Sequence, residues 1–267
     1  MELGIISKTL SEDSFREAKA LGLDFVEYCI NGGDDGTEFF AAIPQIKEWV
    51  SKYQVKVGSV GRWKAMILRE DGSIDPLEQD LAFRLMEAAD ALGCDNYVCG
   101  CNYADALSYY DNCTQAIDFF SAVLAHRPEG MKVSAYNCRK GGNFVNNPMA
   151  WTVIHGHLQE LGIKFDPSHA RYAGEDYLND VKEWGHRFYH VHLKGSMIVN
   201  GERVDDPPAG LDDTNWPIFL SLLRASGYDR GLSIEPHSPI WNGTLGEQGL
   251  RYTVDYMNRL LFRRRDA

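Results

Sequence analysis

Three strand-like runs in the C-terminal half of the chain each carry a potential metal ligand close to the point where the run ends. The runs cover residues 163–167, 188–194 and 231–237, and the side chains in question are Asp166, His192 and Glu235. Carboxylate and imidazole ligands suit a divalent cation of the Mg, Mn, Co or Zn kind. Consecutive strand ends converge only in folds whose parallel strands end together. These residues therefore predict both a metal site and a fold built on parallel strands.

The elements that would position these residues alternate between β-rich and helical segments. Strands are expected at residues 3–6, 25–29, 55–60, 96–99, 132–136, 163–166, 188–193 and 232–235. Helical periodicity fills the intervals, and several helices end in Gly directly before a strand. Eight such units over about 250 residues predict a single (β/α)8 TIM barrel domain spanning 1–267. An open doubly wound sheet is disfavoured, because no G-x-G-x-x-G follows the first strand.

Strand alternation in the seventh run places His190, His192 and Lys194 on one face. His192 is expected near the top of the barrel, Lys194 at the rim as a partner for an oxyanion, and His190 one layer below as a core histidine. His169 lies three residues beyond Asp166, where it could contact substrate oxygens. The long segment 195–213, with its Pro207-Pro208-Ala209-Gly210 stretch, predicts a shaped loop over the barrel mouth.

Further residues are expected to bind substrate. Glu27 ends the second strand and either contacts substrate or forms a structural salt bridge. Trp63, after the third strand, could stack on the face of a sugar, and its neighbour Arg62 could hold a carboxylate or hydroxyl group. His237 shares the strand face of Glu235 and is also assigned to the pocket.

These motifs resemble the xylose isomerase-like barrel superfamily of sugar phosphate isomerases and epimerases over nearly the whole chain. The most specific segments are residues 165–169, 190–194 and 227–236. The resemblance implies a small-molecule sugar substrate. It also implies that Asp166, His192 and Glu235 match three of the four family metal ligands, and that His169 matches a substrate-contacting histidine.

The fourth family ligand is a Glu at the end of the fifth strand, where this chain has Tyr136. In the 3-epimerases of this superfamily, two glutamates act on opposite faces of the substrate carbon. A phenol with a pKa near 10 is a poor base but a serviceable acid. We therefore expect a metal-dependent isomerase, lyase or hydratase with Glu235 as ligand and base and with Tyr136 and Lys194 as further catalytic residues.

Two alternatives remain open at this point. One is a two-base sugar 3-epimerase. The other is a non-catalytic sugar-binding subunit whose metal site is degenerate, with Tyr136 merely filling space; His237 could instead replace the missing ligand. No compact phosphate-binding loop is evident, which favours a neutral or oxidised sugar, and Arg139 and Lys140 are expected on the surface.

Composition excludes several classes of protein. A net charge of −11 disfavours nucleic acid as a partner, and an endonuclease IV-type site would need more histidines than these strand ends supply. No apolar run reaches a membrane span, and the N-terminus lacks a signal-peptide pattern. The Cys99-Gly100-Cys101 pair predicts reduced, buried thiols in a cytoplasmic protein. The basic tail 263–265 is expected to be solvated, and a homo-oligomer remains possible.

Overall fold

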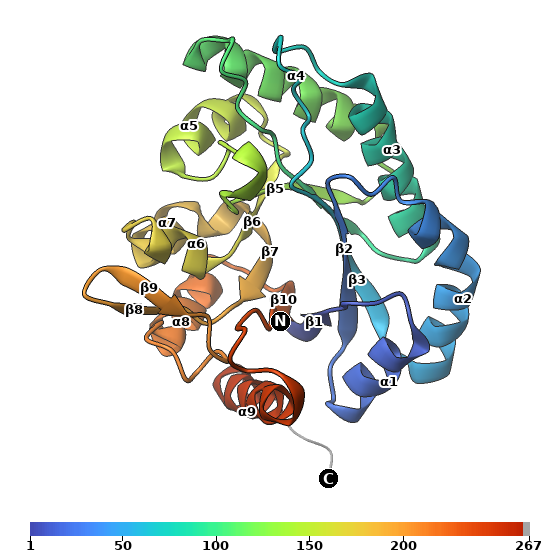
Figure 1. Ribbon diagram of the computed structural model, residues 1–267, viewed down its shortest axis with the longest axis vertical. Coiled ribbons are helices and arrows are strands. Elements are labelled where there is room, and N and C mark those ends of the chain that lie inside the picture. Colours follow the sequence, from blue (N-terminus) through green and yellow to red (C-terminus); the bar gives the residue numbers. More distant parts are fainter. Residues whose placement is uncertain (264–267) are drawn as a thin grey trace.

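The computed structural model describes residues 1–263, which form a closed barrel of eight parallel strands (Figure 1). Around the barrel the strands are β1 (Glu2–Ile6), β10 (Gly231–Ile234), β7 (Phe188–Leu193), β6 (Gly162–Phe165), β5 (Lys132–Tyr136), β4 (Asn96–Cys99), β3 (Lys56–Trp63) and β2 (Phe25–Asn31). Pairing of Leu3 with Leu232 closes the ring between the first and last strands. The predicted (β/α)8 fold is confirmed.

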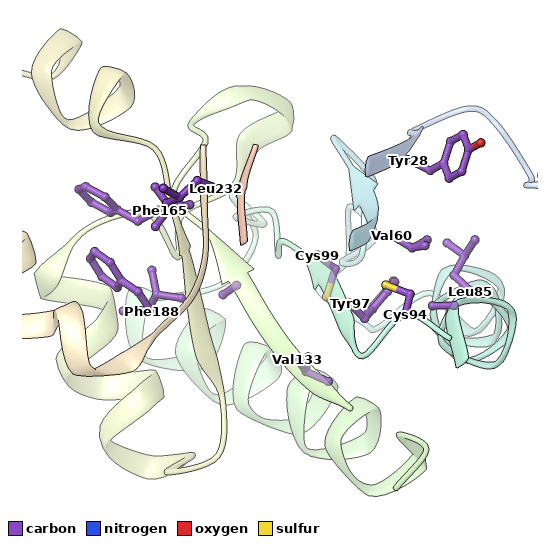
Figure 2. Close-up of a cluster of buried hydrophobic side chains, with 14 of the residues drawn as sticks. Tyr28, Val60, Leu85, Cys94, Tyr97, Cys99, Val133, Phe165, Phe188 and Leu232 are labelled. Atoms are coloured by element: carbon purple, nitrogen blue, oxygen red, sulfur yellow. The ribbon is translucent and has the colours of Figure 1, made fainter. Parts of the chain in front are cut away.

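The helices surround the barrel (Figure 1). They are α1 (Glu12–Ala20), α2 (Thr37–Tyr53), α3 (Pro76–Ala91), α4 (Tyr109–His126), α5 (Pro148–His157), α6 (Pro167–Tyr172), α7 (Tyr177–Trp184), α8 (Trp216–Ala225) and α9 (Gly243–Leu261). Strand side chains such as Val60, Tyr97 and Phe165 belong to the large buried apolar cluster (Figure 2). Within residues 1–263, no helix has the length and apolar character that crossing a membrane requires.

The lower part of the barrel interior is filled by the ring of Phe25. A Cβ atom placed on Gly4 or Gly58 would lie 2.3 Å from this ring, so the two glycines make room for it. Residues that follow at period two along β2, Glu27 and Cys29, rise from this floor toward the carboxyl ends of the strands. The polar residues described below therefore lie above an apolar base.

The long segment after β7 contains a hairpin that the sequence analysis did not anticipate. Strands β8 (Met197–Val199) and β9 (Glu202–Asp205) are antiparallel. Asn200 and Gly201 form the turn with φ angles of 52° and 81°, as expected for an Asn-Gly hairpin turn. The C-terminal helix α9 was also absent from the predicted elements. The Asn-Gly pair between two alternating segments was a usable signal for the hairpin.

Two smaller expectations concern cysteines and the C-terminal tail. All six cysteines are free, and Cys99 and Cys101 are buried, as predicted. Arg263 forms an ion pair with Asp24 rather than being solvated alone. The remaining arginines of the predicted basic tail lie outside the described residues.

Candidate metal centre and active site

Asp166, His192 and Glu235 meet at the carboxyl ends of β6, β7 and β10. One potential ligand atom from each residue lies within 4.8 Å of the other two. Asp166 and His192 are buried, whereas the side chain of Glu235 keeps 21% of its surface exposed. The structure therefore brings together the three residues that the strand ends predicted, and Glu235 is the member that solvent or a substrate can reach.

The start of helix α6 holds Asp166 in place. Its Oδ1 accepts a hydrogen bond from the backbone N–H of Ser168, so the carboxylate caps the helix. The Asn137 side chain donates to the backbone carbonyl of Asp166 and accepts from its N–H, both at 2.9 Å. The other carboxylate oxygen, Oδ2, faces the site and forms an ion pair with the Lys194 ammonium at 3.1 Å. This buried oxygen is therefore already held by a cation, and it is the Asp166 oxygen positioned to bind a metal ion.

A buried carboxylate, Glu27, lies beneath His192 and fixes its orientation. Glu27 Oε1 lies 3.0 Å from His192 Nε2, and Oε2 lies 2.7 Å from His190 Nε2. The hydroxyl of Ser233 also donates to Oε2 at 2.5 Å. Burial opposes ionisation of Glu27, but the two histidines outweigh it and hold its pKa well below the ordinary value. Of the two expectations for Glu27, this position matches the structural ion pair and not a substrate contact.

The donor set fits a divalent metal. His192 donates from Nε2–H to Glu27. Its other ring nitrogen, Nδ1, lies 2.9 Å from Glu235 Oε2. Burial lowers the pKa of His192, but the two carboxylates raise it above its ordinary value, so a proton on Nδ1 holds this contact. A metal ion would take the place of that proton, and a carboxylate behind a ligating histidine is the usual outer-shell arrangement. Glu27, His190 and His192 also cluster, but these groups already satisfy one another.

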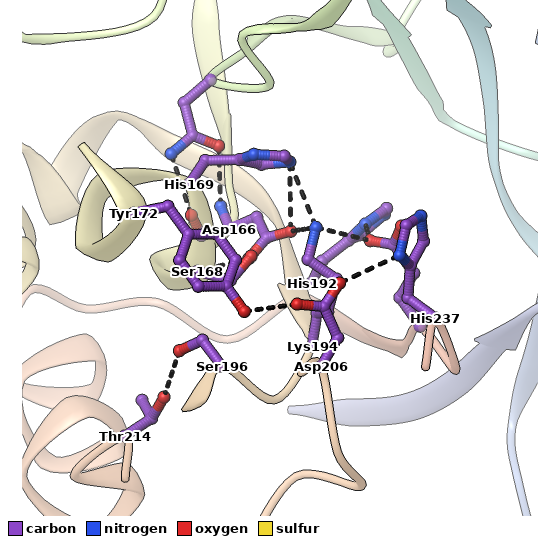
Figure 3. A network of polar contacts seen from close by, with 12 residues as sticks. Asp166, Ser168, His169, Tyr172, His192, Lys194, Ser196, Asp206, Thr214 and His237 are labelled. Atoms are coloured by element: carbon purple, nitrogen blue, oxygen red, sulfur yellow. Dashed lines mark hydrogen bonds and ion pairs between the residues drawn. The ribbon is translucent and has the colours of Figure 1, made fainter. Parts of the chain in front are cut away.

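Lys194 and His169 lie beside Oδ2 of Asp166 (Figure 3). The Lys194 ammonium is 3.1 Å from Asp166 Oδ2, 4.0 Å from Glu235 Oε2 and 3.3 Å from His169 Nε2. Burial and the Lys194 charge lower the pKa of His169 to about 3, so its ring is neutral and accepts from the ammonium. The structure thus places both predicted residues where they can contact a substrate oxygen.

Burial also opposes ionisation of Asp166 and Glu235, but neighbouring cations reverse the effect. The Lys194 ammonium is the strongest opposing influence on each carboxylate, and it holds both pKa values below their ordinary range. Lys194 is itself buried, which disfavours its charge, yet the same carboxylates raise its pKa. At neutral pH the site therefore contains two carboxylates and an ammonium group, all charged.

A pocket of about 580 Å³ opens above these residues. This volume falls within the range of small-molecule sites. Trp63 lines it, as predicted, and its ring centroid is 5.6 Å from that of His192. Lys164 also lines it, with its ammonium 4.8 Å from the centre of the Trp63 ring. Sequence reasoning missed Lys164, although its period-two spacing from Asp166 was a signal for the inner face of the barrel.

The rim of the pocket is built around Asp206, a second residue that the sequence did not reveal. Its carboxylate accepts from His237 Nδ1 at 2.9 Å and from the Tyr172 hydroxyl (Figure 3). It also accepts from the Arg203 guanidinium at 2.5 Å. His237 lines the pocket with 43% of its side chain exposed. It therefore contacts the pocket rim, and it belongs to neither of the two candidate ligand groups.

Tyr136 does not face the metal site as its expected catalytic role requires. Its ring stacks on Trp63, with centroids 4.5 Å apart, and its hydroxyl accepts from the backbone N–H of Lys64 at 3.0 Å. A Cβ atom on Gly100 would lie 2.4 Å from the Tyr136 ring, so this orientation depends on a glycine. Burial raises the pKa of Tyr136 above its ordinary value. The position fits a packing role and gives the predicted acid function no support.

Arg62 is directed away from the pocket, contrary to the expectation of substrate binding. The third strand continues to Trp63 instead of ending at residue 60, so Arg62 and Trp63 point to opposite faces. The Arg62 guanidinium is buried and forms two hydrogen bonds to Glu78, at 2.7 and 2.9 Å. It also donates to the backbone carbonyls of Asn31 and Asp34. These hydrogen bonds join β3 to α3 and to the end of β2, so the guanidinium is not available to a substrate.

Sequence comparison identifies relatives of the chain. Residues 15–260 match the profile of the family described as xylose isomerase-like TIM barrel. The uncharacterized protein YfiH from Bacillus subtilis (strain 168) is 27% identical over 121 residues. That match covers 38% of this chain and 38% of YfiH, which is well under half of either length.

Solved structures share the fold at low sequence identity. D-psicose 3-epimerase, crystallised with D-fructose, superimposes with a TM-score of 0.76 at 12% identity, over 98% of this chain and 99% of the epimerase. The D-allulose 3-epimerase of Methylomonas sp. in complex with D-allulose superimposes with a TM-score of 0.75 at 14% identity, over 97% of this chain and 96% of the epimerase. The IolI protein with a bound zinc atom superimposes with a TM-score of 0.76 at 14% identity, over 100% of both chains. With the profile match over most of its length, the chain belongs to the xylose isomerase-like TIM barrel family.

Proposed function

We propose that this protein is a divalent-metal-dependent isomerase of a sugar or keto-sugar, with the metal held by Asp166, His192 and Glu235. The observation that carries the proposal is the meeting of these three side chains at the barrel mouth, beneath a pocket of about 580 Å³. Family membership and the epimerase structures with the same fold support a sugar as the substrate class.

Three protein ligands leave coordination positions open for a substrate, as in catalytic metal sites. When bound, the metal would supply Lewis acidity to a substrate carbonyl or hydroxyl oxygen and so acidify the adjacent C–H. Mn, Mg, Co and Zn are all compatible with two carboxylates and one imidazole. The IolI structure, which contains zinc, supports this class of ion for the fold.

One carboxylate base is available to a bound substrate. Glu235 is ionised at neutral pH and partly exposed to the pocket, so its free oxygen can accept a proton from a substrate carbon. Removal of the C–H proton beside a carbonyl, its return to the former carbonyl carbon, and transfer of the hydroxyl proton to the former carbonyl oxygen together interconvert an aldose and a ketose. Lys194 and the neutral His169 would hydrogen-bond the substrate oxygens between which the double bond shifts. The part of the Trp63 side chain that lines the pocket would contact the C–H groups of the sugar.

A two-base 3-epimerase is less well supported. Such a reaction needs a second acid or base on the opposite face of the reacting carbon. Tyr136, the expected counterpart, has its hydroxyl engaged with the backbone of Lys64 and its pKa raised by burial. β-Elimination and hydration also need only one carboxylate base, so a lyase or hydratase remains the second candidate.

Proton exchange in D2O tests the proposal. The purified protein, loaded with Mn²⁺, should catalyse interconversion of a ketose and its aldose and should incorporate deuterium at the carbon next to the carbonyl, as read by proton NMR. Formation of an unsaturated product would favour the lyase. Failure to bind a stoichiometric divalent ion would instead favour a non-catalytic sugar-binding protein. Glu235→Gln should lose exchange by at least about 100-fold.

A further inference from the structure

We infer that the pocket accepts a sugar carrying a negative group, a carboxylate or a phosphate, and that Lys164 binds that group. The inference deepens the proposed function, because it names the substrate class of the same site. It revises the expectation, drawn from the missing phosphate-binding loop, that the substrate is a neutral or oxidised sugar and not a phosphorylated one.

Lys164 is a buried cation with no counterion in contact. Its side chain is 1% exposed and lines the pocket, and the ammonium has no hydrogen bond or ion pair within 4.0 Å among the described residues. The ammonium lies over the face of Trp63, 4.8 Å from the ring centre. A cation–π contact is weaker than a charged hydrogen bond to an anion, so the Trp63 ring does not take the place of a counterion.

The lining of the pocket carries further positive charge. Seven lysine and arginine side chains line the pocket, against one carboxylate, Glu235, in a protein whose net charge is −11. Arg139, Lys194 and Arg203 have acidic partners of their own. Lys64 and Lys140, near the end of β3 and after β5, have no carboxylate within 4.0 Å among residues 1–263.

Lys164 lies close to the metal ligands, two residues before Asp166 on the same inward face of β6. It pairs in register with Tyr136 of β5 and with His190 of β7, and its charge acts on both Asp166 and Glu235. A metal ion would neutralise the charges of Asp166 and Glu235, leaving Lys164 without their long-range compensation. A substrate bound at the metal would then place an anionic group against Lys164, which lines the same pocket.

Matched sugars test this inference by calorimetry. D-Glucose, D-glucuronate and D-glucose 6-phosphate differ only at carbon 6. Comparing their affinities therefore gives the contribution of a carboxylate or a phosphate group to binding. Each should be titrated into metal-free and Mn²⁺-loaded protein. Lys164→Met removes the charge and keeps the length, Lys164→Arg keeps the charge, and Lys182→Met removes an exposed charge on α7 as the control. Circular dichroism and thermal melting should verify that each variant is folded.

We expect at least one anionic sugar to bind about tenfold more tightly than D-glucose, which corresponds to one charged hydrogen bond. Lys164→Met should abolish this preference, whereas Lys164→Arg and Lys182→Met should retain it. Whichever of D-glucuronate and D-glucose 6-phosphate binds more tightly identifies the preferred anionic group as a carboxylate or a phosphate. Equal binding of all three sugars, no binding of either anion, or a preference that survives in Lys164→Met would overturn the inference. Metal-dependent turnover without anion preference would contradict this inference alone, and anion preference without turnover would contradict the proposed function alone.

Discussion

The indole of Trp63 lies almost parallel to the ring of Tyr136, at an angle of 12° and a centroid separation of 4.5 Å. This stack occupies the side of the barrel mouth where the resemblance to the family implied a fourth, carboxylate ligand. The site is therefore asymmetric: charged side chains from β6, β7 and the end of β10, Lys164 among them, face an aromatic wall. That asymmetry is the structural basis for assigning one carboxylate base to this protein and not two.

The packing role of Tyr136 predicts a mild effect of Tyr136→Phe. The substitution keeps the stack on Trp63 and loses one hydrogen bond to the Lys64 backbone, which should cost about 1 kcal/mol of unfolding free energy. Metal affinity and turnover should stay within about threefold of wild type, as measured by calorimetry and steady-state kinetics. A loss of turnover by 100-fold or more in a folded variant would restore Tyr136 as an acid catalyst.

Arg62 should matter for stability and not for binding. Arg62→Met leaves Glu78 without its buried partner, which predicts a loss of about 3 kcal/mol in urea unfolding. Sugar affinity of the folded fraction should be unchanged. A matched comparison is Arg69→Met, which removes a more exposed pairing with Asp75 and should cost less than about 1 kcal/mol. Normal stability combined with lost sugar binding would show that Arg62 reaches the substrate.

Glu27→Gln tests whether the buried carboxylate prepares His192 for a metal. The variant keeps the side-chain shape but removes the charge that both histidines contact. Loss of such an outer-shell partner is expected to weaken metal affinity by about 10- to 100-fold. Ser233→Ala, which removes only the neutral hydroxyl from the same carboxylate, should have a smaller effect. Unchanged Mn²⁺ affinity in Glu27→Gln, measured by calorimetry, would refute this role.

Asp180, at the start of α7 and distant in sequence from the site, predicts a dependence of stability on pH. Burial and the nearby Glu175 and Asp176 raise its pKa to about 7, above the ordinary value of 3.8. The folded protein then keeps a proton that the unfolded chain releases, so this contribution to stability is complete below pH ~4 and is lost as pH rises through about 7.

Asp180→Asn should remove this dependence. The melting temperature of the variant should differ little from that of wild type near pH 4.5. At pH 8 the variant should melt at a higher temperature, by a shift that corresponds to about 2 kcal/mol in the free energy of unfolding. Glu183→Gln removes an exposed charge from the same helix and serves as the control. A difference between variant and wild type that does not change with pH would contradict the assignment.

The sequence predicted the meeting of Asp166, His192 and Glu235 because parallel strands of a barrel end at one face, whatever the details of packing. It did not predict the direction of Arg62, because that depends on whether β3 ends before or after this residue, and one residue changes the face. Nor did it predict the orientation of Tyr136, which requires the space left by Gly100, directly after β4. The contacts of Asp206 join segments far apart in the chain, so no local pattern reports them.

Turnover of a ketose by chelated protein, followed by return of the metal, tests the central claim most directly. Protein treated with EDTA and freed of chelator should lose aldose–ketose interconversion, and one equivalent of Mn²⁺ should restore it in wild type but not in His192→Ala. The account predicts that activity follows metal occupancy of the site formed by Asp166, His192 and Glu235. Full activity in the metal-free protein would contradict it.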